Sequence, residues 1–488
     1  MFNNVTRRKP RRRNRSFGRQ KLIKQPFAGL GEWFTSLIRN SRDLAGNRKG
    51  TNFEAVRRAL ISCLEKGVWA ATPGQLFLKK TNVSGAWLGT ASLSEDLSKF
   101  EHVYVLGAGK AALGMAEFLN ARLGTRISGG VVAAAVGGPG RIGRIRVLPA
   151  SHPLPTELSV RAGSSVLELA EKRTERDLYV VLLSGGASAM LCSPIRGVSL
   201  DDKREATRLL LNSGASIWEL NCVRKHISKI KGGRLQELIY PARSITVVIS
   251  DVSGYDISTV GSGPTLPDDT TFSDALTVLE DRKLTARAPG SVVKALENGS
   301  KGYLRETPKP GDPCFSSART LNLGSSTDAC EAIVGELKEK GYNPILRENF
   351  LSGDVRKCAE KFVSELLPSA FAAGYDSVVV SGETTVEVRG PGRGGRNQEF
   401  CLFLAPLIKN TALTVCSLGT DGIDGSSEAA GAFVDGLTYS RAEKSGLSIE
   451  QYLSKNDSGS FFEKMGDAIL TGPTGTNVSD VAVAVTCE

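Results

Sequence analysis

Glycine-rich polar turns repeatedly follow short apolar runs in this 488-residue sequence, and they carry its most reactive residue types. The first turn, in YVLGAGKAALGMA, holds Gly107, Gly109 and Lys110 between an expected strand and an expected helix. Glycines let backbone N–H groups approach an anion at the start of a helix. The turn differs from a P-loop, because Tyr104 and Ala111 stand where that motif requires glycine and serine or threonine. The pattern therefore indicates a lysine in a turn suited to phosphate.

A second polar turn lies in LLSGGASAML, where Ser184, Gly185, Gly186 and Ser188 follow an apolar run. It lacks the GxSxG pattern of a hydrolase nucleophile, so a nest of N–H groups for an anionic ligand is the better interpretation. The later segment NCVRKHISKIKGG carries four cations: Arg224, Lys225, Lys229 and Lys231. They can form a solvated helix face, or a helix end at which Lys231 contacts a ligand.

Three further turns are denser in Gly, Thr and Asp: VVSGETTVEVRGPGRGGRNQEF, CSLGTDGIDGSSEAAGAFVD and LTGPTGTNVSD. Arg393 and Arg396 lie among the glycines of the first, and arginine offers a rigid donor fork that matches carboxylate or phosphate. Glycine loses more conformational freedom on folding than other residues, so this density favours a functional role. Lysine, arginines and anion-binding turns together indicate phosphoryl transfer, which depends on positioning and charge stabilisation.

Acidic residues accompany these turns. Asp251 follows the apolar run VVIS, Asp256 comes five residues later, and Asp421 and Asp424 follow CSLG. Such carboxylates can hold Mg²⁺, which favours one or two acids together with substrate phosphates, or they can cap local turns. We predict Asp251, Asp256 and Asp424 as metal ligands. We predict Asp421 as a catalytic acid that orients the hydroxyl or the metal.

Alternating strands and helices are expected to position these turns. Apolar runs predict strands at 102–106, 131–136, 144–148, 178–183, 245–249, 320–324, 342–346, 378–380, 413–416 and 480–485. Helical spacing predicts helices within 53–67, 111–122, 158–172, 200–231 and 326–340. Continuously apolar strands separated by helices indicate a parallel sheet covered on both faces. Residues 281–316, which contain TPKPGDPC, predict a domain connection. The sequence thus predicts an α/β protein with two domains.

Composition narrows the functional class. The formal net charge is +11, yet ten of the 62 basic residues lie within residues 1–24, which hold no acid, leaving 52 basic and 51 acidic residues. A basic nucleic-acid surface is therefore not expected for the core. The longest apolar runs reach six residues, whereas a membrane span needs about 20. Nine scattered cysteines argue against a disulfide framework and favour a reducing compartment, and three histidines leave little material for His-based metal chemistry.

At these motifs the sequence resembles glycerate kinase of the MOFRL family, the type found in animals and bacteria. The resemblance is carried by the motifs SGETTVEVRGPGRGGRNQE, LGTDGIDGSSEAAGA and TGPTGTNVSD. Three earlier motifs add to it, GAGKAALGMA, RKHISKIKGGRL and SGPTLPD, and all six follow the order of the family. The resemblance spans about residues 52–480. It implies ATP- and Mg²⁺-dependent phosphorylation of D-glycerate, usually at the 2-hydroxyl. It also implies a Rossmann-like α/β domain at 51–312 and a MOFRL-type α/β domain at 313–488, each with a parallel or mixed sheet flanked by helices.

The resemblance also assigns residues. It implies Lys110 and Arg396 as the principal catalytic cations, with Arg393 as a weaker candidate. The predicted substrate or nucleotide contacts are Gly107, Gly109, Ser184, Gly185, Gly186, Ser188, Lys231, Glu383, Arg393, Asn397, Thr420, Thr476 and Asn477. The chain departs from the family pattern in having Ala187 for a glycine, Thr156 for an acid, and Tyr255 for an acid.

Two alternatives remain at this point. In an NAD(P)-dependent hydroxypyruvate reductase, GAGKAA would form a dinucleotide turn, although no acid follows the next strand to hold the ribose. A non-catalytic phospho-ligand or RNA-binding protein could use the basic residues 1–50, an extension expected to be disordered or to direct the protein to mitochondria rather than leave it in the cytoplasm. For the core we expect D-glycerate and ATP as partners and a possible homodimer, without nucleic acid or membrane.

Overall fold

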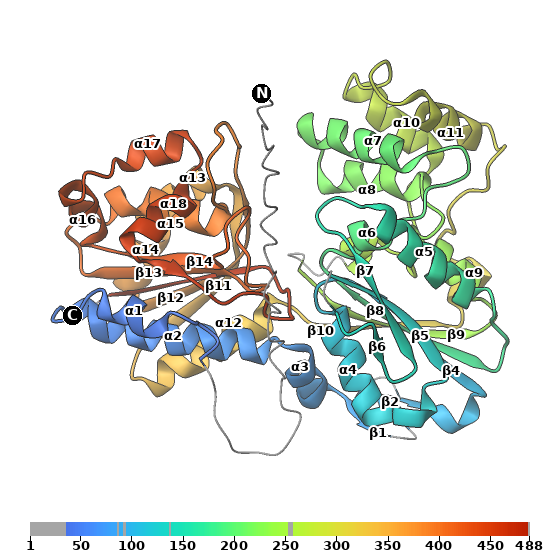
Figure 1. The fold of residues 1–488 in the computed structure, drawn as a ribbon, viewed down its shortest axis with the longest axis horizontal. Coiled ribbons are helices and arrows are strands. Elements are labelled where there is room, and N and C mark those ends of the chain that lie inside the picture. The colour runs from blue at the N-terminus through green and yellow to red at the C-terminus, as the bar shows by residue number, and fades with distance from the viewer. Residues whose placement is uncertain (1–35, 85–86, 91–93, 136–137, 252–256, 487–488) are drawn as a thin grey trace, which may run out of the picture. The chain divides into compact units, whose positions relative to one another are not determined.

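The computed structural model describes residues 36–84, 87–90, 94–135, 138–251 and 257–486, which form two large sheets and one small sheet (Figure 1). The helices are α1 (Ser41–Gly46), α2 (Asn52–Ala70), α3 (Pro73–Lys80), α4 (Ala112–Leu123), α5 (Glu157–Ala170), α6 (Ala187–Met190), α7 (Leu200–Asn212), α8 (Ile217–His226), α9 (Arg234–Ile239), α10 (Phe272–Asp281), α11 (Gly290–Ser300), α12 (Ser326–Glu339), α13 (Val355–Lys361), α14 (Leu367–Ala372), α15 (Arg396–Leu407), α16 (Thr438–Lys444), α17 (Ile449–Ser454) and α18 (Ser458–Met465). The strands are β1 (Asn82–Ser84), β2 (Trp87–Gly89), β3 (Ser94–Asp96), β4 (His102–Ala108), β5 (Gly129–Ala135), β6 (Arg141–Ile142), β7 (Ile145–Ala150), β8 (Asp177–Ser184), β9 (Arg243–Ile249), β10 (Ala318–Gly324), β11 (Pro344–Asp354), β12 (Ser377–Thr385), β13 (Leu413–Gly419), β14 (Gly431–Asp435), β15 (Ala468–Ile469) and β16 (Asp480–Thr486).

The first large sheet has the order β10-β9-β8-β4-β5-β7-β6 and is parallel except at β6. Every residue of β8 is buried, as expected for a parallel strand that is covered on both faces. Val105 and Val180 pack into a core with α4, whereas Leu106 and Val181 pack into a second core with α5. Alternate residues of each strand thus serve opposite faces.

The second large sheet has the order β11-β12-β16-β13-β14-β15 and is mixed. Only the β11–β12 pair is parallel, and β16 lies antiparallel between β12 and β13. Helices α1, α2 and α12 cover one face, and α13, α15 and α18 cover the other (Figure 1). The prediction of an α/β fold with flanked parallel or mixed sheets is confirmed.

The two sheets are not consecutive halves of the chain. Strand β10 follows the predicted boundary at 312/313 but pairs with β9 in the first sheet. Helix α2 precedes that boundary but packs against α12 and β13 of the second sheet. Arg57 of α2 forms ion pairs with Asp435 and Asp467, and both partners are fully buried. An early helix is therefore part of the late-sequence core.

Two sequence expectations differ from the structure. The predicted helix within 200–231 is broken after α7, because Gly214 has a positive φ of 72° and Ser216 starts α8 with a capping box to Glu219. The predicted connection at 281–316 contains α11. Its apolar residues Val292, Ala295 and Leu296 recur at helical spacing and pack with α7, α8 and α10.

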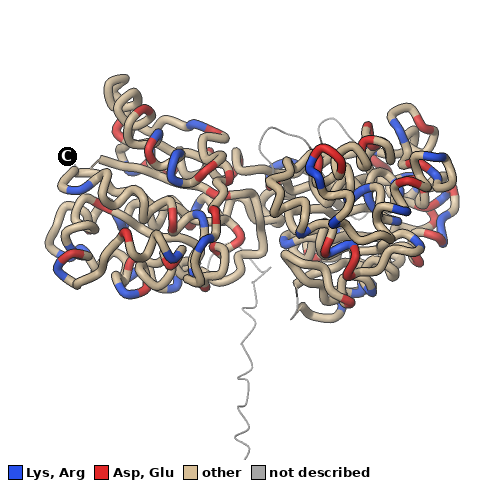
Figure 2. Tube along the Cα trace, turned by 90° about the horizontal axis from the view of Figure 1, so that it is seen from above, with Lys and Arg blue, Asp and Glu red and all other residues tan. Residues whose placement is uncertain are grey.

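Charged residues of both signs are interspersed along the described chain (Figure 2). This distribution agrees with the near balance of 52 basic and 51 acidic residues beyond residue 24. In the described residues, no helix is both long and apolar enough to cross a membrane.

Candidate active site

The polar turns after β4 and β8 are joined by hydrogen bonds. Neighbouring parallel strands bring their carboxyl ends to one edge of a sheet, where α/β proteins bind ligands. The backbone N–H of Lys110 donates to the carbonyl of Gly185 at 2.9 Å, and that of Ala111 donates to Ser184 Oγ at 3.0 Å. Gly109 has a φ of 121°, and a Cβ there would lie 2.2 Å from Ser184 Oγ. The close approach of the two turns thus requires glycine at 109.

Gly185 packs against polar side chains from both large sheets. Asn477 Nδ2 donates to Asp251 Oδ2 at 2.9 Å, directly beside this glycine. A Cβ at 185 would lie 1.9 Å from Asp251 Oδ2 and 2.1 Å from Asn477 Nδ2. The structure thus brings together three of the predicted site residues.

Replacing Gly185 with alanine is expected to lower the free energy of unfolding by about 1–3 kcal/mol, because the new methyl group displaces the Asp251–Asn477 pair. Urea unfolding measures the change. Gly335→Ala is the matched control, because Gly335 lies inside α12 and has open space at its Cβ position. This variant should have a free energy of unfolding about 0.5–1 kcal/mol higher than the wild type. Equal behaviour of the two variants would contradict the packing argument.

Lys110 connects the first sheet to the turn after β13. Its Nζ lies 2.5 Å from Asp421 Oδ2, and its side chain is 27% exposed against 10% for Asp421. The other carboxylate oxygen of Asp421 accepts the backbone N–H of Ile423 at 3.1 Å. Asp421 is thus held in place by its own turn while it faces the lysine.

Arg396 begins α15 and contacts two carboxylates. Its Nη2 donates to Asp480 Oδ1 at 3.0 Å, its Nε donates to Asp480 Oδ2, and its Nη1 lies 2.8 Å from Glu383 Oε1. Strands β12 and β13 run in the same direction, so Glu383 and Asp421 lie at the same edge as Asp480, which begins β16. The guanidinium fork of Arg396 is therefore oriented before any ligand binds.

The electrostatics of this region are dominated by an excess of acids. Burial raises the pKa of Glu383 to about 7 against the charge of Arg396, and Asp480 and Asp251 add to the rise. Burial also raises the pKa of Asp251, which interacts with Lys110, Arg396 and Asp421. Two cations thus neighbour four carboxylates, namely Asp251, Glu383, Asp421 and Asp480.

A divalent cation fits this acid excess, since Mg²⁺ is bound through one or two carboxylates and substrate phosphates. Among the residues that the structure describes, no group of three or more His, Cys, Asp or Glu side chains is placed to hold a metal ion. Asp251 is the acid whose carboxylate is held by an amide rather than by a cation. Asp256 lies outside the described residues.

Asp424 and its neighbours fix the start of α15. Asp424 Oδ1 accepts the backbone N–H of Asn397 at 3.0 Å, and Oδ2 accepts that of Gln398 at 2.8 Å. Burial raises the pKa of Asp424 to about 7. Asn397 Oδ1 accepts the hydroxyl of Ser417 at 2.6 Å. Arg393 lies at an exposed ion pair with Glu463, 2.9 Å away.

Two predicted threonines bind backbone groups. Thr420 donates its hydroxyl to the carbonyl of Ser479 at 2.6 Å and accepts the N–H of Val478 at 2.9 Å. Thr476 donates to the carbonyl of Ala71, just after α2, at 2.6 Å. Gly107 lies inside β4, where a Cβ would be 2.9 Å from Leu182. These residues stabilise the turns through backbone hydrogen bonds and close packing.

Lys231 is fully buried beside the turn after β8. Its Nζ donates to the carbonyl of Ser188 at 2.8 Å and to Ser188 Oγ at 3.0 Å. Ser188 Oγ also lies 2.9 Å from Ser262 Oγ. Lys231 and Ser188 are thus direct neighbours.

Sequence reasoning assigned no role to Asp480 or His152. Asp480 ends the motif TGPTGTNVSD, and its pairing with Arg396 arises only when β16 enters the sheet. His152 lies in SHPLPT, and its Cδ2 is 3.1 Å from the Cβ position of Gly186, which has a φ of 85°. Desolvation, followed by the charge of Lys110, lowers the pKa of His152 to about 4, so it is neutral at neutral pH.

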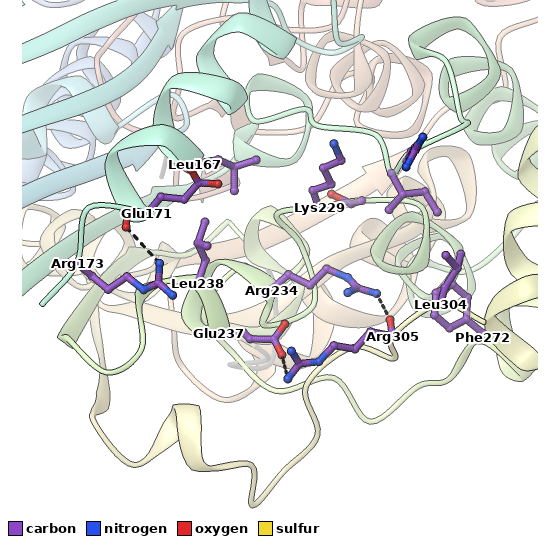
Figure 3. Close-up of a pocket in the computed structure, with 13 residues that line it drawn as sticks. Leu167, Glu171, Arg173, Lys229, Arg234, Glu237, Leu238, Phe272, Leu304 and Arg305 are labelled. Carbon is purple, nitrogen blue, oxygen red and sulfur yellow. Dashed lines mark hydrogen bonds and ion pairs between the residues drawn. The ribbon is translucent and has the colours of Figure 1, made fainter. Parts of the chain in front are cut away.

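A separate basic cavity of about 470 Å³ contains none of the predicted site residues. Figure 3 shows Arg234 across it, donating to the carbonyl of Arg305, while Arg305 pairs with Glu237. Arg173 likewise donates to the carbonyl of Glu171. Three of its arginines therefore already have protein partners.

Two family models match the chain. Residues 59–297 match the domain of unknown function DUF4147, and residues 377–480 match the MOFRL family. The chain thus has the class of architecture in which an α/β DUF4147 domain precedes a MOFRL domain.

Relatives specify the family. The D-glycerate 2-kinase of Thermotoga maritima is 35% identical over 88% of this chain and 99% of its own. A crystal structure of glycerate kinase from the same organism is 34% identical, covers 89% of this chain and 100% of that chain, and has a TM-score of 0.74. A relative from Agrobacterium vitis, 36% identical over 77% of this chain and 85% of its own, is provisionally named a hydroxypyruvate reductase. The chain belongs to the glycerate kinase family that carries the MOFRL domain.

Proposed function

We propose that the protein transfers the γ-phosphoryl group of ATP to D-glycerate, with the 2-hydroxyl as acceptor and Mg²⁺ as the metal. One observation carries this proposal: Lys110 and Arg396 lie among four carboxylates at the strand ends of two sheets. Phosphoryl transfer needs fixed cations at the transferring group and acids that can hold a metal. Membership of the glycerate kinase family supports the choice of substrate.

The described contacts suggest a role for each group. Lys110 Nζ would stabilise charge on the transferring phosphoryl group, and Arg396 would do the same from an orientation fixed by Asp480 and Glu383. Asp421 Oδ2 is the candidate to accept the proton of the glycerate hydroxyl once Lys110 turns to the phosphoryl group. Asp251 would hold Mg²⁺, which supplies charge neutralisation of the phosphates when bound.

A coupled assay tests the proposal. ADP release should require ATP, Mg²⁺ and D-glycerate together, and enolase without phosphoglycerate mutase should consume the product if the 2-hydroxyl is the acceptor. A product that needs the mutase would place the phosphate on the 3-hydroxyl. ADP release without glycerate, or none in any mixture, would contradict the proposed kinase activity.

A hydroxypyruvate reductase is the second candidate, because the Agrobacterium vitis relative carries that provisional name. A dinucleotide would have to bind at the turn that contains Gly109 and Lys110. Titration of NADH and NADPH fluorescence distinguishes the two functions. Saturable binding with hydroxypyruvate-dependent oxidation would favour the reductase, and absence of both would exclude it.

The remaining expectations are also proposals. We place a domain division near residue 312, with α2 and β10 exchanged across it, as the packing of these elements suggests. A homodimer is proposed, with light scattering as its test. The extension predicted at 1–50 is too long, because Ser41–Gly46 forms α1 and Arg48 is buried against Asp435 and Asp467. The basic residues that precede α1 are proposed as a mitochondrial targeting segment, with a cytoplasmic location as the alternative. N-terminal sequencing of the mature protein distinguishes these locations.

A further inference from the structure

A group of buried hydrogen-bond donors lies beside the turn after β8, apart from the acids described above. Lys231 is 0% exposed, and its Nζ donates to Ser188 and to the carbonyl of Gly261 at 3.3 Å. Lys203 is 3% exposed, and its Nζ donates to the carbonyl of Ile227 at 3.1 Å. In the described part of the chain, neither ammonium group pairs with a carboxylate. Such an accumulation of buried cations is unfavourable unless they lose protons or meet an anion.

The charge of Arg224 is the reason why we expect this group of donors to bind an anion. It lies on α8, partly buried, and makes no hydrogen bond or ion pair with the residues that the structure describes. Burial lowers the pKa of Arg224 to about 10, so the guanidinium keeps its charge at neutral pH. The two lysines can release their protons when desolvated, but arginine cannot at this pH. Among the described residues, Arg224 is therefore a positive charge without an acidic partner.

Asn221 provides a second, independent sign of a missing ligand. It lies one helical turn before Arg224, so the two side chains share a face of α8. Asn221 is 4% exposed, its Oδ1 accepts the hydroxyl of Ser262 at 2.9 Å, and its Nδ2 has no partner. Buried amide donors are normally satisfied, so this one indicates an acceptor that lies outside the described residues.

The donor group adjoins the phosphoryl-transfer residues. Ser188, which contacts Lys231, follows three residues after Gly185, whose carbonyl binds the N–H of Lys110. His152 packs over Gly186 between them, and its pKa responds to Lys110 first and more weakly to Asp421 and Arg224. Arg224 and Lys110 are thus both close enough to His152 for their charges to act on it.

We propose that Arg224, supported by Asn221 and Lys231, binds the carboxylate of the acceptor substrate. This inference rests on the proposed glycerate kinase function and names its acid-binding subsite. A small 2-hydroxy acid carries its carboxylate on the carbon next to the reacting hydroxyl, so the subsite must adjoin Lys110. The four acids near Arg396 repel a carboxylate and suit a metal-bound phosphate, whereas the donor group holds cations and amides. Arginine matches a carboxylate with two parallel hydrogen bonds.

Steady-state kinetics of Arg224→Met and Arg224→Lys test the subsite. Both should raise the KM for D-glycerate, Arg224→Met by roughly 100-fold or more, while the KM for ATP changes less than about twofold. Lys229→Met is the matched control, because Lys229 is an exposed cation five residues later and should leave both constants unchanged. Arg224→Lys should be milder but still impaired, because lysine cannot form the two-point contact.

Thermal unfolding gives a readout that a structural role would not produce. Removing an unpaired, partly buried charge should leave the Tm of ligand-free Arg224→Met unchanged or higher. D-glycerate should raise the Tm of the wild-type chain but not that of Arg224→Met. A lower ligand-free Tm with an intact glycerate shift, or a raised KM for ATP instead of glycerate, would overturn the inference. If the wild-type chain phosphorylates glycerate and Arg224→Met has the same KM for glycerate, the proposed carboxylate subsite is wrong but the kinase function stands. If the wild-type chain shows no turnover, the proposed kinase function is wrong.

Discussion

Replacing Lys110 with methionine is expected to lower kcat for glycerate phosphorylation by roughly 10³-fold, the scale of losing a fixed cation at a transferring phosphoryl group. The Nζ of Lys110 is the cation that spans from the first sheet to Asp421 of the second, 2.5 Å away. Methionine keeps the length of the stem but cannot stabilise the developing charge. ADP release at saturating ATP and glycerate measures the change.

Lys357→Met serves as the control for Lys110, because Lys357 is exposed on α13 and the acid Asp421 pairs with Lys110 instead. It should keep wild-type kcat. Circular dichroism melting should show that Lys110→Met remains folded. Retained turnover in a folded Lys110→Met variant would remove Lys110 from the proposed mechanism.

Replacing Arg57 with methionine is expected to lower the free energy of unfolding by about 3–5 kcal/mol, the cost of breaking a buried ion network by removing one partner. Arg57 is fully buried and lies 2.6 Å from Asp435 and 2.7 Å from Asp467. Arg48 contacts the same two acids at 2.7 and 3.1 Å. Without Arg57, Arg48 remains for both buried carboxylates, and Arg441 contacts Asp467 at 2.9 Å.

Urea unfolding measures this loss, and Arg58→Met is a control at the next residue of the same helix. Arg58 is 62% exposed and pairs with Glu54 at the surface, so its removal should change the unfolding midpoint little. Comparable losses in the two variants would show that the buried network does not carry the effect.

The same network fixes how the protein responds to acid. Burial opposes ionisation of Asp467, but Arg57, Arg48 and Arg441 lower its pKa to about 2. Because this pKa lies below the unfolded value of about 3.9, the stabilisation is present above that pH and is lost as the pH falls toward 2. Arg57→Met should move this acid-induced loss to higher pH.

The local parts of the site were predictable from sequence, because apolar runs and glycine turns are short-range signals. Lys110 and Gly109 were expected in a turn between a strand and a helix, and the structure has them between β4 and α4. The partners were not predictable, because Arg396 of α15 meets Asp480, 84 residues away, only when β16 lies between β12 and β13. The break before α8 was missed because Gly214 lies inside an otherwise continuous helical pattern.

The burial of two cations could not be predicted from the sequence for a related reason. Arg224 and Lys231 belong to a run of cations that equally describes a solvated helix face. Only burial separates them from Lys229, which is exposed in the same segment. Burial depends on how α8 packs with α7 and α10, which the spacing of charges does not encode.

The central place of β16 has a consequence for synthesis on the ribosome. Its neighbours β12 and β13 leave the ribosomal exit tunnel before Asp480–Thr486 does. They therefore emerge before the strand that lies between them in the sheet. Arg57 is likewise synthesised long before its ion-pair partners Asp435 and Asp467. During translation the nascent chain therefore exposes the unpaired edges of β12 and β13, and Arg57 lacks its two acidic partners. The second large sheet can therefore be completed only after Asp480–Thr486 has emerged.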